Sequence, residues 1–230
     1  MNKEGNRYTF LFSVVMVLVV AIVLTLVSTG LQPRQNANVE NEKRQNILSS
    51  VKVNVSREAS AGAFDTYITR QIVVNSRGEE VAGDAFAIDM GKEMKKAPAE
   101  RLLPVFIARV NGETKYIFPT RGTGLWGPLW GYVSLNEDKN TIFGAVFDHK
   151  GETPGLGAEI THEEFRSQFD GKQIFEGDKL VAVRVEKGGK AAGPHEVDAI
   201  SGGTITSKGV EAMLLDNLTC YESFLRQTLP

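Results

Sequence analysis

Residues 102–119 read LLPVFIARVNGETKYIFP and contain the clearest β-structure signal in the chain. Two runs rich in β-branched and aromatic residues, 102–110 and 114–119, flank Asn111 and Gly112. An Asn-Gly pair readily adopts the positive φ angles that a tight hairpin turn requires. The segment therefore predicts two antiparallel strands joined by a short turn.

Further elements are predicted on both sides of this hairpin. Strands are expected at 71–75, 131–135, 141–148 and 180–186, and a short helix at 57–69. Ser76-Arg77-Gly78 is typical of a turn after the strand at 71–75. Thr161 and Glu164 have the spacing of a capping box, which predicts a helix from there to about Phe169. The segment from Gly188 to Gly203 is expected to be a loop.

The C-terminal segment has a helical pattern. Apolar residues recur there at spacings of three and four, namely Val210, Met213, Leu214, Leu218, Tyr221, Phe224 and Leu225. Ser207 stands where an N-cap is expected. Strands with few intervening helices indicate a single α+β domain, with a mainly antiparallel sheet and flanking helices.

The N-terminal region differs from the rest of the chain. Residues 8–33 contain no charged side chain, and 18 of the 24 residues from Tyr8 to Leu31 are hydrophobic. About 20 apolar residues suffice for a helix to cross a bilayer. The run is longer than the apolar core of a cleaved signal peptide, roughly 7–15 residues, and it lacks an A-x-A-like site. We therefore expect an uncleaved transmembrane helix.

This helix divides the chain into four expected parts. They are a short cytoplasmic tail (1–7), a transmembrane helix (8–31), a polar Asn/Gln-rich stalk (32–46) and a folded extracytoplasmic domain (47–230). Lys3 and Arg7 lie close to the apolar run in a very short tail, which favours a cytoplasmic N-terminus.

Composition excludes several classes of protein. The formal net charge of -2 argues against a dedicated nucleic-acid binder. The lone Cys220 excludes an intrachain disulfide and a self-contained iron–sulfur centre. The histidines lack metal-ligand spacing, so we expect no metal site. Residues 122–127 match G-x-G-x-x-G, but no helical period follows them, so we do not expect a dinucleotide site.

The segment VDAISGGTITS, residues 197–207, precedes the C-terminal helix. Backbone N–H groups at a helix start favour an anion such as phosphate, and Gly202 and Gly203 permit close backbone approach. From the residues alone, a phosphate-binding turn and an ordinary capped loop both remain open.

Three motifs in order carry a resemblance that covers essentially the whole chain. VDAISGGTITSKGV (197–210) resembles the flavinylation motif of FMN-binding domains. GTGLWGPLWGYVSL (122–135) and ETPGLGAEI (152–160) resemble two further segments of the same family. With its apolar N-terminus, the chain is similar to the C-subunit family of the sodium-translocating NADH:quinone reductases.

The resemblance implies that a dedicated flavin transferase attaches FMN through a phosphate ester to Thr204. The family usually has Ala before this threonine, whereas this chain has Gly203, which predicts a looser turn. The resemblance implies no catalytic residue, because the cofactor carries the redox chemistry.

The resemblance also implies roles around the flavin. The phosphate would be positioned by Ser201, Gly202, Gly203, Thr206 and Ser207. The remainder of the cofactor would contact Gly124, Leu125, Trp126, Glu152, Thr153, Leu156 and Gly157. Asp198 of the flavinylation motif would orient the turn or be recognised by the transferase. Plainer interpretations stay open: helix capping by Thr206 and Ser207, a core position for Trp126, a surface charge at Glu152 and a turn-forming role for Asp198.

The function implied is that of a subunit held in the bacterial inner membrane beside the other subunits of the reductase. Its flavin would relay electrons from NADH, oxidised on another subunit, toward ubiquinone or menaquinone, with sodium export coupled by the complex. Two alternatives remain: the G subunit of an Rnf-type ion-translocating complex, and an extracytoplasmic FMN-binding module without turnover.

Overall fold

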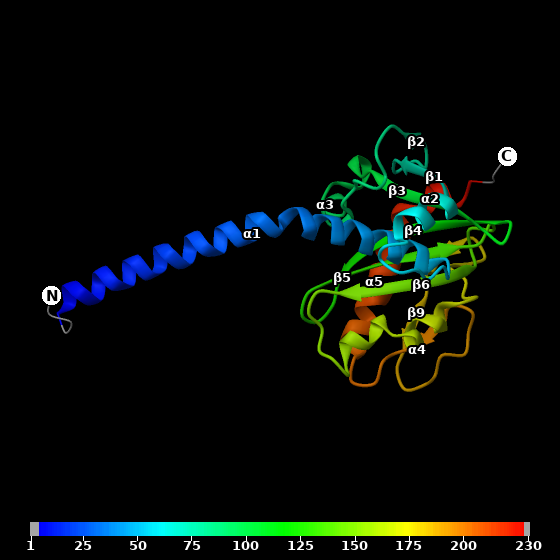
Figure 1. Cartoon of the computed structure of the whole chain (residues 1–230). Coiled ribbons are helices and arrows are strands. Elements are labelled where there is room, and N and C mark those ends of the chain that lie inside the picture. The colour runs from blue at the N-terminus through cyan, green and yellow to red at the C-terminus, as the bar shows by residue number, and fades with distance from the viewer. Residues whose placement is uncertain (1–4, 228–230) are drawn as a thin grey trace. The chain divides into compact units, whose positions relative to one another are not determined.

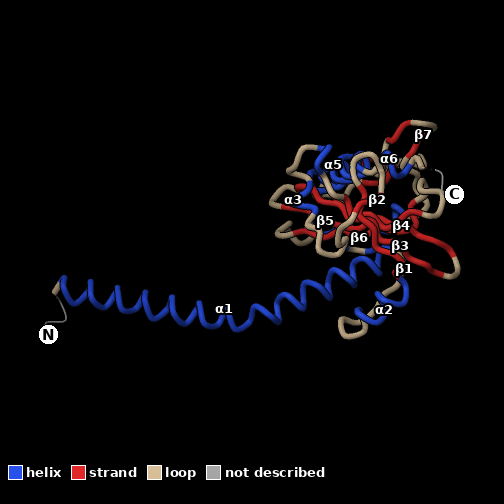
Figure 2. The backbone as a smooth tube through the Cα atoms, turned by 90° about the horizontal axis from the view of Figure 1, so that it is seen from above, coloured by secondary structure: helices blue, strands red, loops and turns tan. Residues whose placement is uncertain are grey.

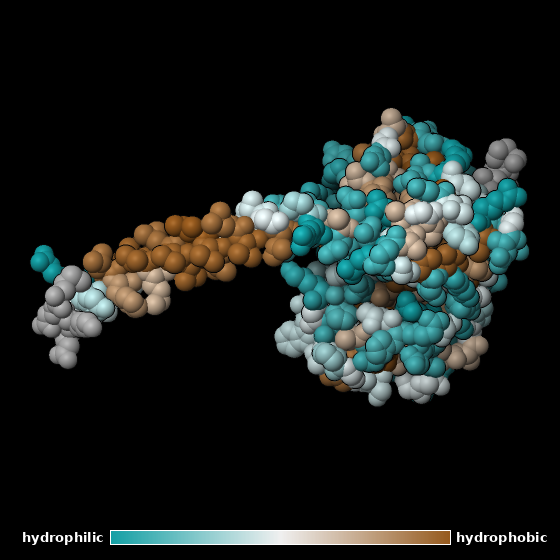
Figure 3. Space-filling model, in the orientation of Figure 1, coloured by the Kyte–Doolittle hydropathy of each residue, from teal (hydrophilic) through white to brown (hydrophobic). Residues whose placement is uncertain are grey.

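The computed structural model describes residues 5–227, which fall into two compact units, one ending at Lys43 and one beginning at Arg44. Helix α1 (Asn6–Ser50) starts in the first unit and ends in the second (Figure 1). Its apolar part is long and apolar enough to cross a membrane, judged by length and composition (Figure 3). The expected stalk, 32–46, is helical throughout, and Pro33 lies inside the helix. Residues 1–4 of the expected tail lie outside the described residues.

The second unit contains the predicted antiparallel sheet. Within residues 5–227 the main sheet has six strands in the order β2-β1-β3-β4-β5-β6, and all neighbours are antiparallel. The strands are β1 (Ile68–Val74), β2 (Glu80–Val81), β3 (Leu103–Val110), β4 (Glu113–Thr123), β5 (Pro128–Leu135) and β6 (Ile142–His149). The predicted hairpin is confirmed as β3 and β4, with Val110 opposite Glu113.

Helices cover the two faces of this sheet. Figure 2 shows α5 (Thr204–Cys220) and α2 (Ser60–Tyr67) on opposite sides of it. Because side chains alternate along a strand, neighbouring residues enter different cores: Val105 packs in the cluster that contains Leu214, and Phe106 packs in the cluster that contains Phe64. The ring of Phe118 on β4 lies 4.9 Å from that of Tyr221. These contacts fix α5 over β4.

The C-terminal helical pattern is confirmed, but the predicted N-cap is wrong. All seven periodic apolar residues are buried: four lie on α5, two lie on the short helix α6 (Glu222–Leu225), and Tyr221 lies between the two helices. The helix begins at Thr204 with Gly203 as its N-cap, so Ser207 lies inside the first turns. Gly202 has a φ of 74°, so the chain turns there and the helix begins before Ser207, the residue predicted as its N-cap. The Ser207 hydroxyl donates to the Gly203 carbonyl and accepts from the Ile200 N–H.

The predicted strand at 180–186 is divided. It forms β8 (Lys179–Leu180) and β9 (Arg184–Glu186), because Ala182 between them adopts a φ of 52° that a strand cannot contain. Strand β8 pairs with β7 (Phe175–Glu176). Strand β9 pairs in parallel with β10 (Glu196–Asp198), which lies where the sequence predicted only a loop.

The predicted capping box is also wrong. The Thr161 hydroxyl donates back to the Ala158 carbonyl, because Thr161 ends a preceding 3-10 helix and does not begin the next helix. The segment forms three short pieces: η2 (Gly157–Thr161), α4 (Glu163–Arg166) and η3 (Ser167–Phe169). The remaining short helices are α3 (Met90–Glu93) and η1 (Pro98–Glu100).

Candidate functional site

Three segments singled out from the sequence meet at the start of α5. An ideal Cβ on Gly203 would lie 2.9 Å from the carbonyl oxygen of Leu156, which places the loop 152–157 against the helix start. An ideal Cβ on Gly124 would lie 2.5 Å from Oε1 of Glu152, which places the turn 124–127 against the same loop. The fold thus brings together residues that are about 80 positions apart in the sequence.

The first turn of α5 has the properties of an anion site. Thr204 is its first residue and is half-buried, while Ser201 and Gly202 before it are exposed. Among the described residues no side chain caps this helix start. The leading N–H groups of an α-helix have no partner within the helix, and the helix dipole adds positive potential there. A phosphate at this position would meet donors that the protein leaves available.

Gly203 does not loosen the turn as expected. Its φ of -107° is one that any residue adopts, so the backbone conformation at this position does not require glycine. It is fully packed, and a Cβ there would also approach Cγ2 of Ile200 to 2.9 Å. The absence of a side chain therefore lets Leu156 pack directly on the turn.

Thr204 opens into a pocket of about 330 Å³. The pocket is lined by Lys187, Gly188, Gly189, Ala199, Ile200, Ser201, Gly202 and Thr204. The parallel pairing of β9 with β10, extended by the bond from the Ala199 N–H to the Glu186 carbonyl, carries Lys187 to this place. Lys187 was missed by the sequence analysis. Its only local signal is a basic residue before Gly188-Gly189, and the pairing that places it is not visible in sequence.

The turn 124–127 connects β4 to β5. The Gly124 N–H donates to the Gly127 carbonyl at 2.8 Å, which closes a tight hairpin turn. The G-x-G-x-x-G match is therefore a strand-to-strand turn, not the strand-to-helix turn of a dinucleotide site. Leu125 and Trp126 are 49% and 69% exposed. A core position for Trp126 is thereby wrong.

The loop 152–157 is held by its own backbone. The Thr153 carbonyl accepts from the N–H groups of Leu156 and Ala158, both at 3.1 Å. Glu152 is buried, so a role as a surface charge is wrong. Its Oε1 accepts from the Trp126 N–H, and its Oε2 accepts from the Thr206 hydroxyl. The hydroxyls of Thr206 and Ser207 thus both have protein partners, while Thr153 is exposed.

The site is bordered by exposed apolar side chains. In the described part of the second unit, the large hydrophobic residues that are exposed are Leu125, Trp126, Leu156, Ile205 and Leu215. Four of these belong to the three segments that meet at the start of α5. These side chains give the surroundings of Thr204 an exposed apolar surface.

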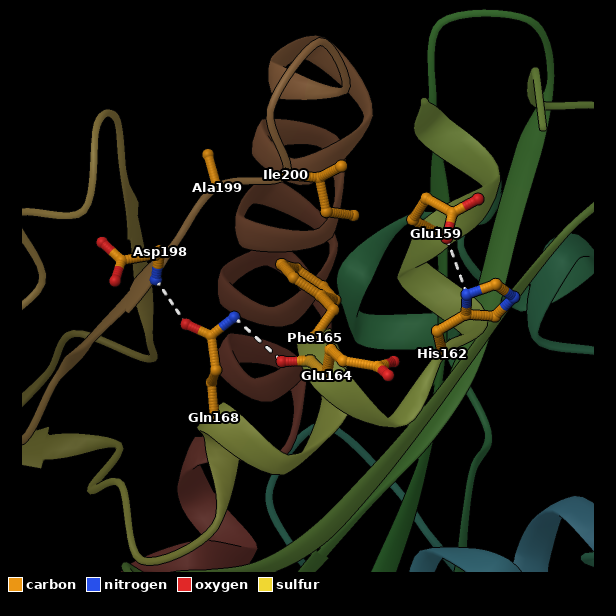
Figure 4. A pocket seen from close by; sticks show the side chains of 8 residues that line it. All are labelled: Glu159, His162, Glu164, Phe165, Gln168, Asp198, Ala199 and Ile200. Atoms are coloured by element: carbon orange, nitrogen blue, oxygen red, sulfur yellow. Dashed lines mark hydrogen bonds and ion pairs between the residues drawn. The ribbon is translucent and has the colours of Figure 1, made fainter. Parts of the chain in front are cut away.

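Asp198 lines a second pocket of about 350 Å³, which shares Ala199 and Ile200 with the pocket of Thr204. Figure 4 shows the Asp198 N–H directed to Oε1 of Gln168, at 2.8 Å. The Asp198 carboxylate accepts from the Ala191 N–H at 3.0 Å, so it holds the loop that follows β9. His162 in the same pocket pairs with Glu159 at 2.6 Å.

The remaining candidate ligand residues are engaged separately. Nδ1 of His149 accepts from the Glu152 N–H, and Nδ1 of His195, a buried residue, lies 2.7 Å from the Gln173 carbonyl. Cys220 packs half-buried against the core and contacts Arg101. Within residues 5–227 no three His, Cys, Asp or Glu side chains are grouped so that they could hold a metal ion.

Comparisons with known proteins agree with this geometry. The family model described as "FMN-binding domain" matches residues 124–219. The C subunit of the Na(+)-translocating NADH-quinone reductase from Vibrio anguillarum is 33% identical, over 91% of this chain and 89% of that protein. The crystal structure of the corresponding subunit from Parabacteroides distasonis has a TM-score of 0.81 at 49% identity and covers 86% of this chain and 98% of that one. The crystal structure of NqrC from Shewanella oneidensis has a TM-score of 0.69 at 27% identity. It covers 82% of this chain and 98% of that one.

Proposed function

This chain belongs to the C-subunit family of the Na(+)-translocating NADH-quinone reductases, and on that basis we propose that it carries FMN as a phosphate ester on Thr204 and relays electrons within that oxidoreductase complex. The placement of Thr204 carries the proposal. Thr204 is the first residue of α5, lines a pocket and lies among the backbone N–H groups that begin the helix. A phosphate esterified there would interact with these N–H groups without any change in the fold.

The residues present fit such a group. Ser201 and Gly202 are exposed at the turn, and Gly202 and Gly203 let Leu156 pack against it. Lys187, across the pocket, supplies a positive charge. Thr206 and Ser207 act through the helix that they stabilise, since their hydroxyls bond to protein atoms. Asp198 keeps the loop after β9 in place. None of these groups donates or accepts electrons.

When bound, FMN supplies one- and two-electron redox chemistry. Leu125, Trp126 and Leu156 would offer the ring an apolar surface, and Gly124, Thr153 and Gly157 belong to the turn and the loop that hold those side chains. The Glu152 carboxylate holds Trp126 in place by accepting a hydrogen bond from the Trp126 backbone N–H. Because these three apolar residues are exposed, the ring would remain within reach of redox partners on other subunits.

The N-terminal unit would supply the anchorage. We propose that 8–31 spans the bacterial inner membrane, with residues 1–7 cytoplasmic, 32–46 as a helical stalk and 47–230 as the periplasmic FMN-binding domain. No charged residue lies between Tyr8 and Pro33, so sodium would not cross through this helix alone. Sodium export and reduction of ubiquinone or menaquinone would be shared with the other subunits. The C-subunit relatives favour this assembly over an Rnf-type complex or an isolated flavin module.

Intact-mass analysis tests the proposal. The full chain, produced together with its flavin transferase, is expected to gain the mass of FMN minus water, because the Thr204 Oγ–P bond replaces a P–O bond of the donor. The denatured chain is expected to fluoresce as a flavin in a gel. Thr204→Ala should lose both signals, whereas Thr219→Ala, an exposed threonine on the same helix, should retain them. A mass gain that survives Thr204→Ala would refute the assignment.

A further inference from the structure

The buried carboxylate of Glu152 joins the turn 124–127 to the first turn of α5, which contains the proposed attachment residue Thr204. Its Oε1 accepts from the backbone N–H of Trp126 at 2.8 Å, and its Oε2 accepts from the Thr206 hydroxyl at 2.6 Å. Glu152 is only 5% exposed, so both bonds are shielded from water. Loss of either partner would leave a buried polar group unpaired, which is costly.

Two glycines make room for this carboxylate. An ideal Cβ on Gly124 would lie 2.5 Å from Oε1 of Glu152. An ideal Cβ on Gly157 would lie 2.6 Å from Oε2 and 2.4 Å from Oγ1 of Thr206. These separations are too short for carbon and oxygen, so alanine at either position would displace the carboxylate. The glycines of both loops therefore serve the Glu152 contacts.

The consequence for Thr204 follows from helix geometry. Thr206 lies two residues beyond Thr204 in the first turn of α5, so a bond that fixes Thr206 also fixes the rotation of that turn. The turn sets the direction in which the Thr204 side chain leaves the backbone. The other oxygen of Glu152 fixes the backbone at Trp126, whose indole is exposed beside the site.

We propose that Glu152 is a positioning residue for flavin attachment, and that its carboxylate sets both the presentation of the Thr204 hydroxyl and the place of Trp126. The inference rests on the proposed function, since it concerns the reaction at Thr204. In that reaction the Oγ–P bond forms, the P–O bond to the leaving group of the flavin nucleotide breaks, and the hydroxyl proton ends on the departing group. Glu152 acts on none of these atoms, because both its oxygens face Trp126 and Thr206.

The test measures the rate at which the full chain acquires FMN, by intact mass, during co-production with the transferase. Glu152→Ala and Thr206→Val each remove one side of the contact and are expected to slow attachment about tenfold or more. Thr206→Ser keeps the hydroxyl. In Glu152→Gln the amide oxygen accepts from Trp126 and the amide N–H donates to Thr206. Both conservative variants should recover to within about threefold of the wild-type rate.

Controls separate the possible failures. Glu163→Gln changes an exposed acid of helix α4 and should attach FMN at the wild-type rate. A wild-type chain that acquires no FMN would refute the proposed function itself. If the wild type acquires FMN and both Glu152→Ala and Thr206→Val acquire it at the wild-type rate, only the role of Glu152 is refuted. Near-ultraviolet circular dichroism reports folding. If Glu152→Ala does not fold, the comparison of Thr206→Val with Thr206→Ser decides, and equal rates in that pair overturn the inference.

Discussion

The backbone of Leu156 packs against Gly203 so closely that a Cβ at residue 203 would lie 2.9 Å from the Leu156 carbonyl oxygen. This contact joins the loop 152–157 to the turn that precedes α5, across 47 positions of sequence. The packing of Leu156 therefore requires glycine at residue 203.

Gly203→Ala is expected to destabilise the folded domain by about 1–3 kcal/mol, because the new methyl group displaces Leu156. Thermal unfolding followed by circular dichroism measures the change. Gly62→Ala is the matched control: it lies in helix α2, a Cβ there meets no atom within 4 Å, and it should raise stability by up to about 1 kcal/mol. An unchanged Tm for Gly203→Ala would contradict the packing argument.

Lys187→Ala is expected to slow the attachment of FMN about two- to fivefold at low ionic strength, because it removes the cation from the pocket of Thr204. The difference from wild type should shrink at high salt, since Lys187 is exposed and its charge is screened. Initial rates from intact mass at two salt concentrations provide the measurement. Lys179→Ala, an exposed lysine on β8, should behave as wild type.

Trp126→Ala should leave thermal stability within about 0.5 kcal/mol of wild type, because the indole is 69% exposed. It should nevertheless change the visible circular dichroism of the bound flavin, since the ring would lose an apolar neighbour. Leu214→Ala provides the contrast: this core side chain is fully buried, and its truncation should cost about 2–5 kcal/mol. A flavin spectrum identical to wild type would remove Trp126 from the proposed ring contacts.

Glu93 predicts a dependence of stability on pH. Burial alone would raise the pKa of Glu93, but hydrogen bonds from the Leu102 N–H and the Lys96 ammonium outweigh it and hold this pKa below 4.5. The carboxylate therefore contributes stability above pH 4.5, and this contribution is lost as the pH falls through the lower folded-state pKa.

The corresponding experiment is denaturant unfolding at several pH values. Glu93→Gln should lose about 1–3 kcal/mol at pH 7, and the gap to wild type should narrow toward pH 3. Glu100→Gln, an exposed neighbour, should track wild type at every pH. A gap that stays constant with pH would show that Glu93 acts by packing alone.

Strong local patterns predicted much of the fold correctly. The Asn111-Gly112 hairpin, the strand pair that became β5 and β6, and the apolar stripe of α5 are each specified by neighbouring residues, through turn chemistry or helical period. The predicted loop was wrong where a distant contact decides. Strand β10 forms because it meets β9. The capping box failed for a local reason: the Thr161 hydroxyl bonds to the carbonyl of Ala158, three residues earlier.

The candidate site divides in the same way. From the sequence, Thr204, its glycines and the two loops could be proposed as a site, because motif order and residue type are local properties. It left Glu152 between a surface charge and a flavin contact, and it missed Lys187, because burial and pocket lining depend on which segments fold together.

The sequence by itself determined the apolar N-terminal helix, the antiparallel hairpins and the amphipathic C-terminal helix, since periodicity and turn residues act over a few positions. Only the tertiary structure decided that Glu152 lies buried between Trp126 and Thr206, and that Leu156 rests on Gly203. Both features depend on groups from different segments that meet only in the folded chain, and no local pattern encodes such a meeting.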